Sequence, residues 1–242
     1  MLKLCSVSKK YAKSDTYAVN DVNIHVKGGE IYGFIGPNGA GKTTTIKMII
    51  GVLSPTEGSI EINGTDIAKN GNKAKKNIGY VSDSHVMYDM LTGKEYVNFL
   101  ADVYGVSAED RQKRCEKLLE MFGMKDAFNS QISTYSHGMK QKINVIGALI
   151  HEPPVWILDE PMTGLDPQSA HALKTLMKEH RDKGNVVFFS THVLEVAEKL
   201  CDRVGIISDG KLIKEGTLEE IAGSEKASSL EDLFLALTKK EK

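Results

Sequence analysis

A glycine-rich loop near residue 40 has the residue spacing of a phosphate-binding turn. Gly36 and Gly41 stand five positions apart and are followed at once by Lys42 and Thr43, which is the pattern G-x-x-x-x-G-K-[ST]. Glycine lets the backbone turn tightly and bring its N–H groups close to phosphate oxygens. The spacing predicts ATP binding and hydrolysis, with the Lys42 ammonium on the outer phosphates and the Thr43 hydroxyl on Mg²⁺. The predicted loop comprises Gly36, Pro37, Asn38, Gly39, Ala40, Gly41, Lys42, Thr43 and Thr44.

Two carboxylates stand at the end of an apolar run in the second half of the chain. Residues 155–158 are Val-Trp-Ile-Leu, and Asp159 and Glu160 follow them directly. In open α/β sheets, ligands bind at the carboxyl ends of the strands. We therefore expect Asp159 to hold Mg²⁺ and Glu160 to polarise the attacking water as general base. Two acids after a strand are common by themselves, and the phosphate loop earlier in the chain favours this role over a structural one.

The elements that must position these residues follow from the apolar pattern. Residues 31–35 read as a buried strand that enters the glycine loop, and residues 42–50 read as the helix that leaves it. Helical patterns then dominate residues 91–150, where Ser107 to Asp110 resembles a helix-capping box. Strands and helices alternate again in residues 155–158, 167–183, 186–190, 193–200 and 204–208. This order predicts an α/β fold with a mainly parallel sheet that carries a helical insertion.

Composition argues against several classes of protein. Thirty-one Lys and Arg residues against 32 Asp and Glu leave a net charge of −1, whereas nucleic-acid binders usually show a basic excess. The three cysteines, Cys5, Cys115 and Cys201, are far apart and lack metal-ligand spacing. No apolar run approaches the roughly 18–20 residues of a membrane span, and the N-terminus lacks the apolar stretch of a signal peptide. We expect a protein that is neither secreted nor embedded in a membrane by itself.

Further motifs follow the phosphate loop in a fixed order, and together they resemble the nucleotide-binding subunit of ABC transporters over almost the whole chain. Tyr135-Ser136-His137-Gly138-Met139 lies at that family's signature sequence. Gly164-Leu165-Asp166 is similar to its D-loop, and Ser190-Thr191-His192 to its switch histidine. Tyr11 lies where the family places an aromatic ring on adenine; a strand-end tyrosine in the core is the other reading.

The resemblance implies both the fold and a shared site. The implied fold is a P-loop NTPase (RecA-like) core with a mainly parallel sheet, an N-terminal antiparallel β-subdomain and an inserted α-helical subdomain. The ATPase domain would span residues 1–222, with the insertion at about 84–152 and a helical tail at 223–242. Ser136 and Gly138 would grip the γ-phosphate of ATP held by a second ATP-binding subunit, identical or different, with Asp166 beside it. His192 would contact the γ-phosphate from its own subunit, and Ser136 would also serve as a helix N-cap.

The chain departs from the family pattern at two places. The signature usually reads Leu-Ser-Gly-Gly-Gln, and His137 and Met139 replace its first glycine and its glutamine. The family usually has a glutamine where this chain has Asp83, and that glutamine contacts Mg²⁺ and the attacking water. A carboxylate can also ligate Mg²⁺, so Asp83 is a candidate metal ligand. The alternative is a loop aspartate that never reaches the metal.

The resemblance further implies which process ATP drives. The partner would be a polytopic membrane permease on a separate chain, which would hold this subunit at the cytoplasmic face of the membrane. Residues 84–104 would dock it, although their Met and aromatic side chains suit a subdomain core equally well. The tail at residues 230–238 resembles ATPases paired with ABC-2-type exporters, which favours export. A ribosome- or DNA-acting ATPase and a silent regulatory cassette fit less well, so no nucleic-acid partner is expected.

Overall fold

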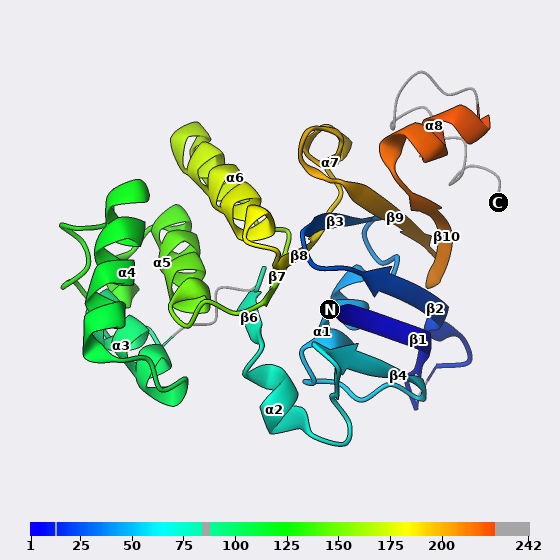
Figure 1. The fold of residues 1–242 in the computed structure, drawn as a ribbon, viewed down its shortest axis with the longest axis horizontal. Coiled ribbons are helices and arrows are strands. Elements are labelled where there is room, and N and C mark those ends of the chain that lie inside the picture. Colours follow the sequence, from blue (N-terminus) through cyan, green and yellow to red (C-terminus); the bar gives the residue numbers. More distant parts are fainter. Residues whose placement is uncertain (13, 84–87, 226–242) are drawn as a thin grey trace.

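The computed structural model describes residues 1–12, 14–83 and 88–225, and a six-stranded sheet forms its centre (Figure 1). The strand order is β10-β9-β3-β8-β7-β6. Strands β9, β3, β8, β7 and β6 pair in parallel, and β10 pairs antiparallel with β9. Their bounds are β3 (Glu30–Ile35), β6 (Ile78–Val81), β7 (Val155–Asp159), β8 (Val186–Thr191), β9 (Arg203–Ser208) and β10 (Lys211–Gly216). The predicted mainly parallel α/β sheet is confirmed.

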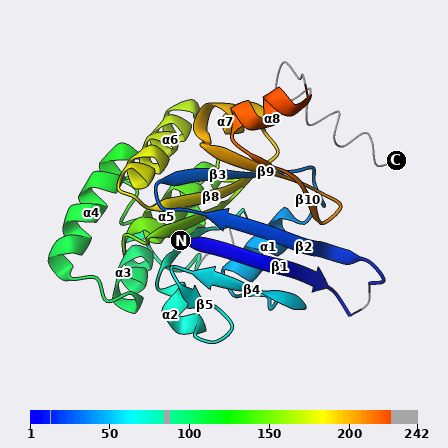
Figure 2. The same ribbon diagram turned by 45° about the vertical axis from the view of Figure 1, so that its right-hand side comes forward.

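A second, antiparallel sheet contains the N-terminal strands. Its order is β2-β1-β4-β5, formed by β1 (Leu2–Lys10), β2 (Tyr17–Val26), β4 (Glu57–Ile62) and β5 (Thr65–Asp66). The Asn63-Gly64 turn joins β4 to β5, and both residues have positive φ, as this tight hairpin requires. Side chains of β1 and β2 share a buried cluster with α1 (Lys42–Ile49) and with the large sheet. Figure 2 shows this layer lying alongside α1.

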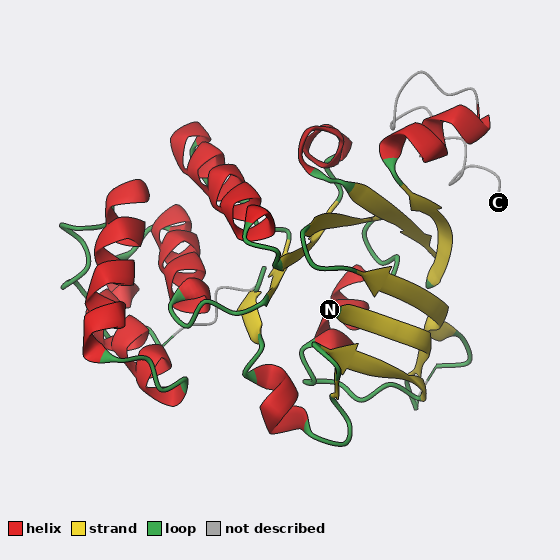
Figure 3. Ribbon diagram, in the orientation of Figure 1, coloured by secondary structure: helices red, strands yellow, loops and turns green. Residues whose placement is uncertain are grey.

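The inserted helices lie to one side of the two sheets (Figure 3). They are α3 (Gly93–Val103), α4 (Ala108–Met121), the short 3-10 helix η1 (Ile132–Thr134) and α5 (His137–Leu149). Ser107 caps α4, because its Oγ accepts the Asp110 N–H at 3.1 Å. The Asp110 carboxylate accepts the Ser107 hydroxyl and not the Ser107 N–H, so the predicted capping box is present only in its serine half. The remaining helices are α2 (Gly71–Lys75), α6 (Pro167–Asp182), α7 (Leu194–Leu200) and α8 (Leu218–Glu225).

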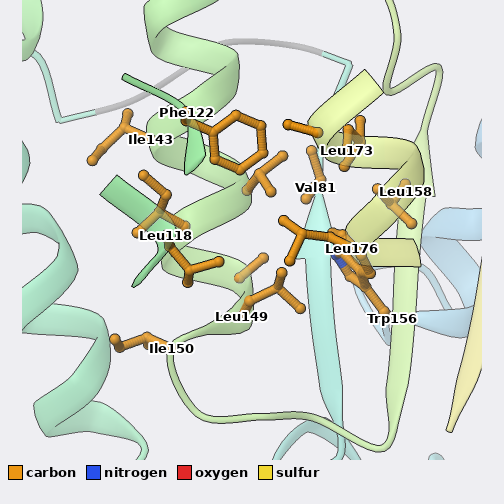
Figure 4. Packing of buried hydrophobic residues seen from close by; sticks show 14 of the residues in the cluster. Val81, Leu118, Phe122, Ile143, Leu149, Ile150, Trp156, Leu158, Leu173 and Leu176 are labelled. Carbon is orange, nitrogen blue, oxygen red and sulfur yellow. The ribbon is translucent and has the colours of Figure 1, made fainter. Parts of the chain in front are cut away.

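The insertion shares one hydrophobic core with the large sheet. Leu118 of α4, Phe122 just after α4 and Ile143 of α5 belong to the same buried cluster as Val81 and Trp156 of the sheet (Figure 4). Burying such side chains contributes about 1.5–3 kcal/mol each. The helical region is therefore packed firmly against strands β6 and β7, and α5 is fixed relative to the residues at their ends.

Two of the sequence predictions concern the C-terminal end of the chain. Helix α8 crosses the boundary at residues 222 and 223 that the sequence suggested. The tail motif at residues 230–238 lies outside the described residues.

Among the helices that the structure describes, none has the length and apolar character needed to cross a membrane.

Candidate functional site

The glycine loop connects β3 to α1 at the carboxyl edge of the large sheet. Gly39 and Gly41 have φ values of 84° and 109°, in a region that favours glycine. A Cβ atom on Gly36 would lie 2.4 Å from the carbonyl oxygen of Ile207 in β9. Two different constraints, backbone rotation and close approach, therefore demand glycine in this loop.

The loop forms one wall of an open hollow of about 220 Å³. Gly41 precedes α1, and no described side chain caps the first turn of that helix. Its N–H groups and the positive end of the helix dipole therefore face the hollow and suit an anion. The lining residues are Ala18, Pro37, Asn38, Gly39, Gly41, Lys42, Thr43, Thr44, Asp83 and Glu160. A larger hollow of about 430 Å³ lies between α3 and α4, away from this loop and these acids.

Lys42 is the cation of the hollow. Its Nζ donates to the carbonyl oxygens of Gly36 at 2.6 Å and Pro37 at 3.2 Å, so its own loop holds it. Nζ also lies 3.5 Å from Glu160 Oε1. The residue is only 6% exposed. A phosphate beside this ammonium would meet a charge that water screens weakly.

Asp159 ends β7, directly before Glu160, which lines the hollow. It is buried, and its Oδ1 accepts the Ser190 hydroxyl at 2.6 Å. Burial raises the pKa of Asp159, while hydrogen bonds from the Ser190 and Thr43 hydroxyls oppose that shift. The negative charges of Asp83 and Glu160 raise the pKa further. Burial and the two neighbouring carboxylates thus disfavour the ionised form of Asp159, and a bound cation would stabilise that form.

Glu160 is held in an unusual backbone conformation. Its φ is 46°, in the left-handed region that non-glycine residues rarely occupy. Its N–H donates to Ser190 Oγ at 3.0 Å. Its carboxylate lies between two groups, because Oε2 is 3.0 Å from His192 Nδ1 and Oε1 faces Lys42. His192 is half exposed, and its ring meets the hollow only through its contact with Glu160.

Among the described residues, no group of three or more His, Cys, Asp or Glu side chains is arranged so that it could hold a metal ion by itself. Mg²⁺ does not need one, since it commonly takes one or two carboxylates together with phosphate oxygens and water. Thr43 and Asp159 hydrogen-bond each other, and Asp83 lines the same hollow. Hard oxygen donors are the ligands that Mg²⁺ prefers, so these three residues fit the ion.

Tyr11 lies just beyond β1 and does not line the hollow. Its side chain is 44% exposed, which is inconsistent with the alternative of a core tyrosine. The Lys9 ammonium sits 5.8 Å from the centre of its ring. An exposed ring at the end of this strand is free to stack on a flat ligand.

The signature residues occupy a different place, at the first turn of α5. Ser136 is the N-cap of that helix, and its Oγ accepts the Met139 N–H at 3.3 Å. A Cβ atom on Gly138 would lie 2.8 Å from the Gly164 carbonyl oxygen, and one on Gly164 would overlap the His137 ring. Among the described residues that line the phosphate hollow, none comes from this turn.

Asp166 caps helix α6 in its own chain. Its two carboxylate oxygens accept the Ser169 N–H at 2.8 Å and the Ser169 hydroxyl at 2.7 Å. Lys142 Nζ lies 3.0 Å away. These contacts, the Ser169 hydroxyl first, hold the pKa of Asp166 well below its usual range. The carboxylate therefore stays charged throughout the pH range in which proteins fold.

Ser190 is a site residue whose role the sequence did not reveal. It is fully buried, donates to Asp159 and accepts from Glu160, so one hydroxyl joins both acids. Its partner in the β7–β8 register is Asp159. The order of the two strands in the sheet decides this pairing, and no short-range spacing in the chain encodes it.

A glycine loop between a strand and a helix, with two acids at the end of a neighbouring parallel strand, defines a P-loop nucleoside triphosphatase. A family model described as "ABC transporter" matches residues 19–163. The linearmycin resistance ATP-binding protein LnrL of Bacillus subtilis (strain 168) is 38% identical over 221 residues, which are 91% of this chain and 70% of that protein.

Two solved structures are similar along the chain. The structure of an ATP-binding subunit of an ABC transporter has a TM-score of 0.94 at 37% identity and covers 98% of this chain and 99% of that one. The ATP-binding cassette MJ0796, solved as a dimer in a post-hydrolysis state with ADP and Pi, has a TM-score of 0.81 at 29% identity; 90% of this chain and 99% of that one are covered. This chain belongs to the ABC transporter ATP-binding family. It is an ATPase and the ATP-binding subunit of such a transporter.

Proposed function

We propose that the hollow binds the triphosphate of Mg²⁺-ATP and that Glu160 is the general base of its hydrolysis. The observation that carries this proposal is the line of contacts from Lys42 through Glu160 to His192. Lys42 attracts the outer phosphates, and the Glu160 carboxylate accepts a proton from the attacking water. His192 orients that carboxylate and can donate to the γ-phosphate with its second ring nitrogen.

Thr43, Asp159 and Asp83 are the residues that would hold Mg²⁺. When bound, the ion supplies positive charge to the β- and γ-phosphate oxygens. Ser190 keeps Asp159 in place through a hydrogen bond of 2.6 Å. Asp83 stands at the rim, where a short carboxylate replaces the longer amide that the family pattern has.

The second half of the site belongs to another subunit in this proposal. Ser136 and Gly138 lie at the N-terminus of a 13-residue helix, outside the hollow of their own chain. Such a helix end suits an anion, and the dimer of MJ0796 with ADP and Pi is consistent with a shared site. We infer that ATP is bound between two cassettes, with Ser136 and Gly138 of one on the γ-phosphate held by the other.

We further propose that the subunit drives export through a separate membrane permease and sits on it at the cytoplasmic face of the membrane. Exposed apolar side chains gather where α3 faces outward, with Tyr88 edge-on to Phe99 at 6.0 Å and Val103 one turn further along. Met90 beside them is 81% exposed. Large exposed apolar side chains in a patch mark a contact surface. Export agrees with the name of the relative LnrL, a linearmycin resistance protein.

A pull-down from detergent-solubilised membranes tests the permease partner. The tagged chain is expected to recover a polytopic membrane protein, and recovery of ribosomes instead would contradict transport. Val103→Glu should abolish that recovery while ATPase activity persists, because a buried charge at an interface is costly. Val52→Glu is the matched control, since Val52 is equally apolar and 71% exposed but lies between α1 and β4.

A dilution series tests the shared site. If two chains form each site, ATP turnover per chain should fall as the protein is diluted below the dissociation constant of the dimer. Light scattering should then show the dimer in ATP and a smaller species without it. Constant turnover per chain in a protein that remains monomeric would overturn the proposal.

A further inference from the structure

Helix α5 touches the segment after Glu160 through one buried hydrogen bond. Gln141 Nε2 donates to the Pro161 carbonyl oxygen at 3.1 Å, and Gln141 is only 1% exposed. Its Oε1 atom is buried and finds no partner among the described residues, which is unfavourable. A leucine would fill similar space without that unmet acceptor. The amide N–H is therefore the part of Gln141 that the fold uses.

The bond acts on a backbone that needs support. Glu160 has a φ of 46°, a conformation that persists in a non-glycine residue only when its surroundings impose it. Ser190 Oγ accepts the Glu160 N–H on one side. Gln141 holds the carbonyl of the next residue, Pro161, on the other. These two bonds, one from β8 and one from α5, bracket residues 160 and 161.

Two further contacts join α5 to the residues that follow. The His137 ring lies where any side chain on Gly164 would stand, and Lys142 Nζ is 3.0 Å from Asp166 Oδ2. Both His137 and Lys142 are exposed or half-buried residues near the start of α5. Gln141 is the fully buried member of the set. Its partner, Pro161, directly follows Glu160, whereas the other two contacts reach residues 164 and 166.

We propose that Gln141 is a positioning residue for hydrolysis. By holding Pro161, it keeps Glu160 in the left-handed conformation that aims its carboxylate at Lys42 and His192. Ser136 is the N-cap of α5. The same bond therefore connects the turn that would receive a second subunit's phosphate to the Glu160 carboxylate, which acts on the ATP of its own chain. The inference rests on the proposed role of Glu160 as general base.

The first test is Gln141→Leu in the full-length chain, assayed with Mg²⁺-ATP at a concentration where ATP induces the dimer. Loss of the donor should lower kcat about tenfold, because small misplacement of a catalytic group is costly. The KM for ATP should change by less than about twofold, since the phosphate loop is untouched. Gln112→Leu is the matched control, because Gln112 is an exposed glutamine of α4 that bonds only its own helix.

The second test is Gln141→Glu, which adds a pH readout that a purely structural residue would not give. Burial raises the pKa of a carboxyl group. Once protonated, the carboxyl O–H can donate to the Pro161 carbonyl, whereas the ionised form has no donor. The kcat of this variant, relative to the parent at the same pH, should therefore rise as the pH falls from about 8 to about 6.

The outcomes separate this inference from the function on which it rests. A Gln141→Leu protein that melts like the parent and keeps its kcat would overturn the inference. If that variant folds poorly, a pH-independent kcat ratio for Gln141→Glu would overturn it instead. Glu160→Gln tests the underlying role by itself: if that variant hydrolyses ATP like the parent, the general-base assignment fails whatever Gln141 does.

Discussion

Helices α1 and α5 each have an N-terminus that we propose binds phosphate, but the two ends are built differently. The N-cap of α1 is Gly41, with a φ of 109°, and no described side chain forms a capping hydrogen bond to the first turn. The N-cap of α5 is Ser136, whose hydroxyl already accepts the Met139 N–H. Near the start of α1 the chain gathers Lys42 and the acids Asp159 and Glu160, whereas no described residue of the turn at Ser136 lines the hollow.

This difference separates a site that can do chemistry from one that can only bind. The α1 end has a cation, the carboxylate that we propose as general base, and oxygen donors within a few ångströms of each other. The α5 end offers a hydroxyl, N–H groups and a helix dipole, which attract a phosphate without reacting with it. The bond from Gln141 to Pro161 joins the two.

Glu160→Gln should stop chemistry at the α1 end and leave binding intact. An amide of the same shape cannot take a proton, so kcat should fall by about 10²–10⁴-fold. ATP should then trap the dimer, which light scattering would detect. Glu195→Gln is the control, because Glu195 forms only an exposed ion pair with Lys199. Equal phosphate release by Glu160→Gln and the parent would remove the chemical distinction between the two helix ends.

Acid should destabilise the packing around His180, a buried residue of α6. Burial, assisted by Lys183, lowers the pKa of His180 to about 4 from an ordinary 6.5. A lowered histidine pKa means that the unfolded chain binds the proton more readily, so stability is full above about pH 6.5 and falls as the pH drops toward 4. The loss attributable to this residue is roughly 3 kcal/mol.

Urea unfolding followed by tryptophan fluorescence measures that loss. Trp156 is the only tryptophan in the sequence, and its ring lies 5.6 Å from that of His180. The unfolding free energy of His180→Leu should depend less on pH between 7 and 4.5 than that of the parent. If the unfolding free energies of the variant and the parent depend equally on pH, His180 is not a buried neutral histidine.

Ser136→Asp should distinguish capping from phosphate binding at the α5 end. Aspartate is as good an N-cap as serine, so thermal stability should change little. Its charge should repel a phosphate from the second subunit and weaken ATP-dependent dimerisation by about tenfold or more. Ser136→Ala should do the opposite, with about 1 kcal/mol of lost stability and a smaller effect on assembly. A Ser136→Asp protein that dimerises normally in ATP would limit Ser136 to capping.

Asp83→Ala should have the smallest effect, because Asp83 is exposed at the rim of the hollow. We expect turnover to fall a few-fold and the Mg²⁺ concentration for half-maximal activity to rise, since one of about two carboxylate ligands is lost. A magnesium titration of ATPase activity measures both. If neither changes, Asp83 is the loop aspartate of the alternative interpretation.

Local patterns predicted much of the architecture. The strand before Gly36, the helix after Thr43 and the return of strand–helix alternation after Pro154 all appear at the expected places. These elements were predictable because apolar periodicity and glycine turns act over a few residues. The sequence did not indicate helix α2 or the capping box at Thr92, where Glu95 bonds back to the N-cap.

What the sequence determined by itself was the chemistry available at each position: a loop that can cradle phosphate, two acids after a strand, a histidine after another, and a serine before a helix. Which of these meet was decided by the tertiary structure. Ser190 joins both acids only because β8 lies beside β7, and Gln141 reaches Pro161 only because α5 packs on that edge of the sheet. Contacts between residues 20 or more positions apart depend on strand order and packing, which no local spacing specifies.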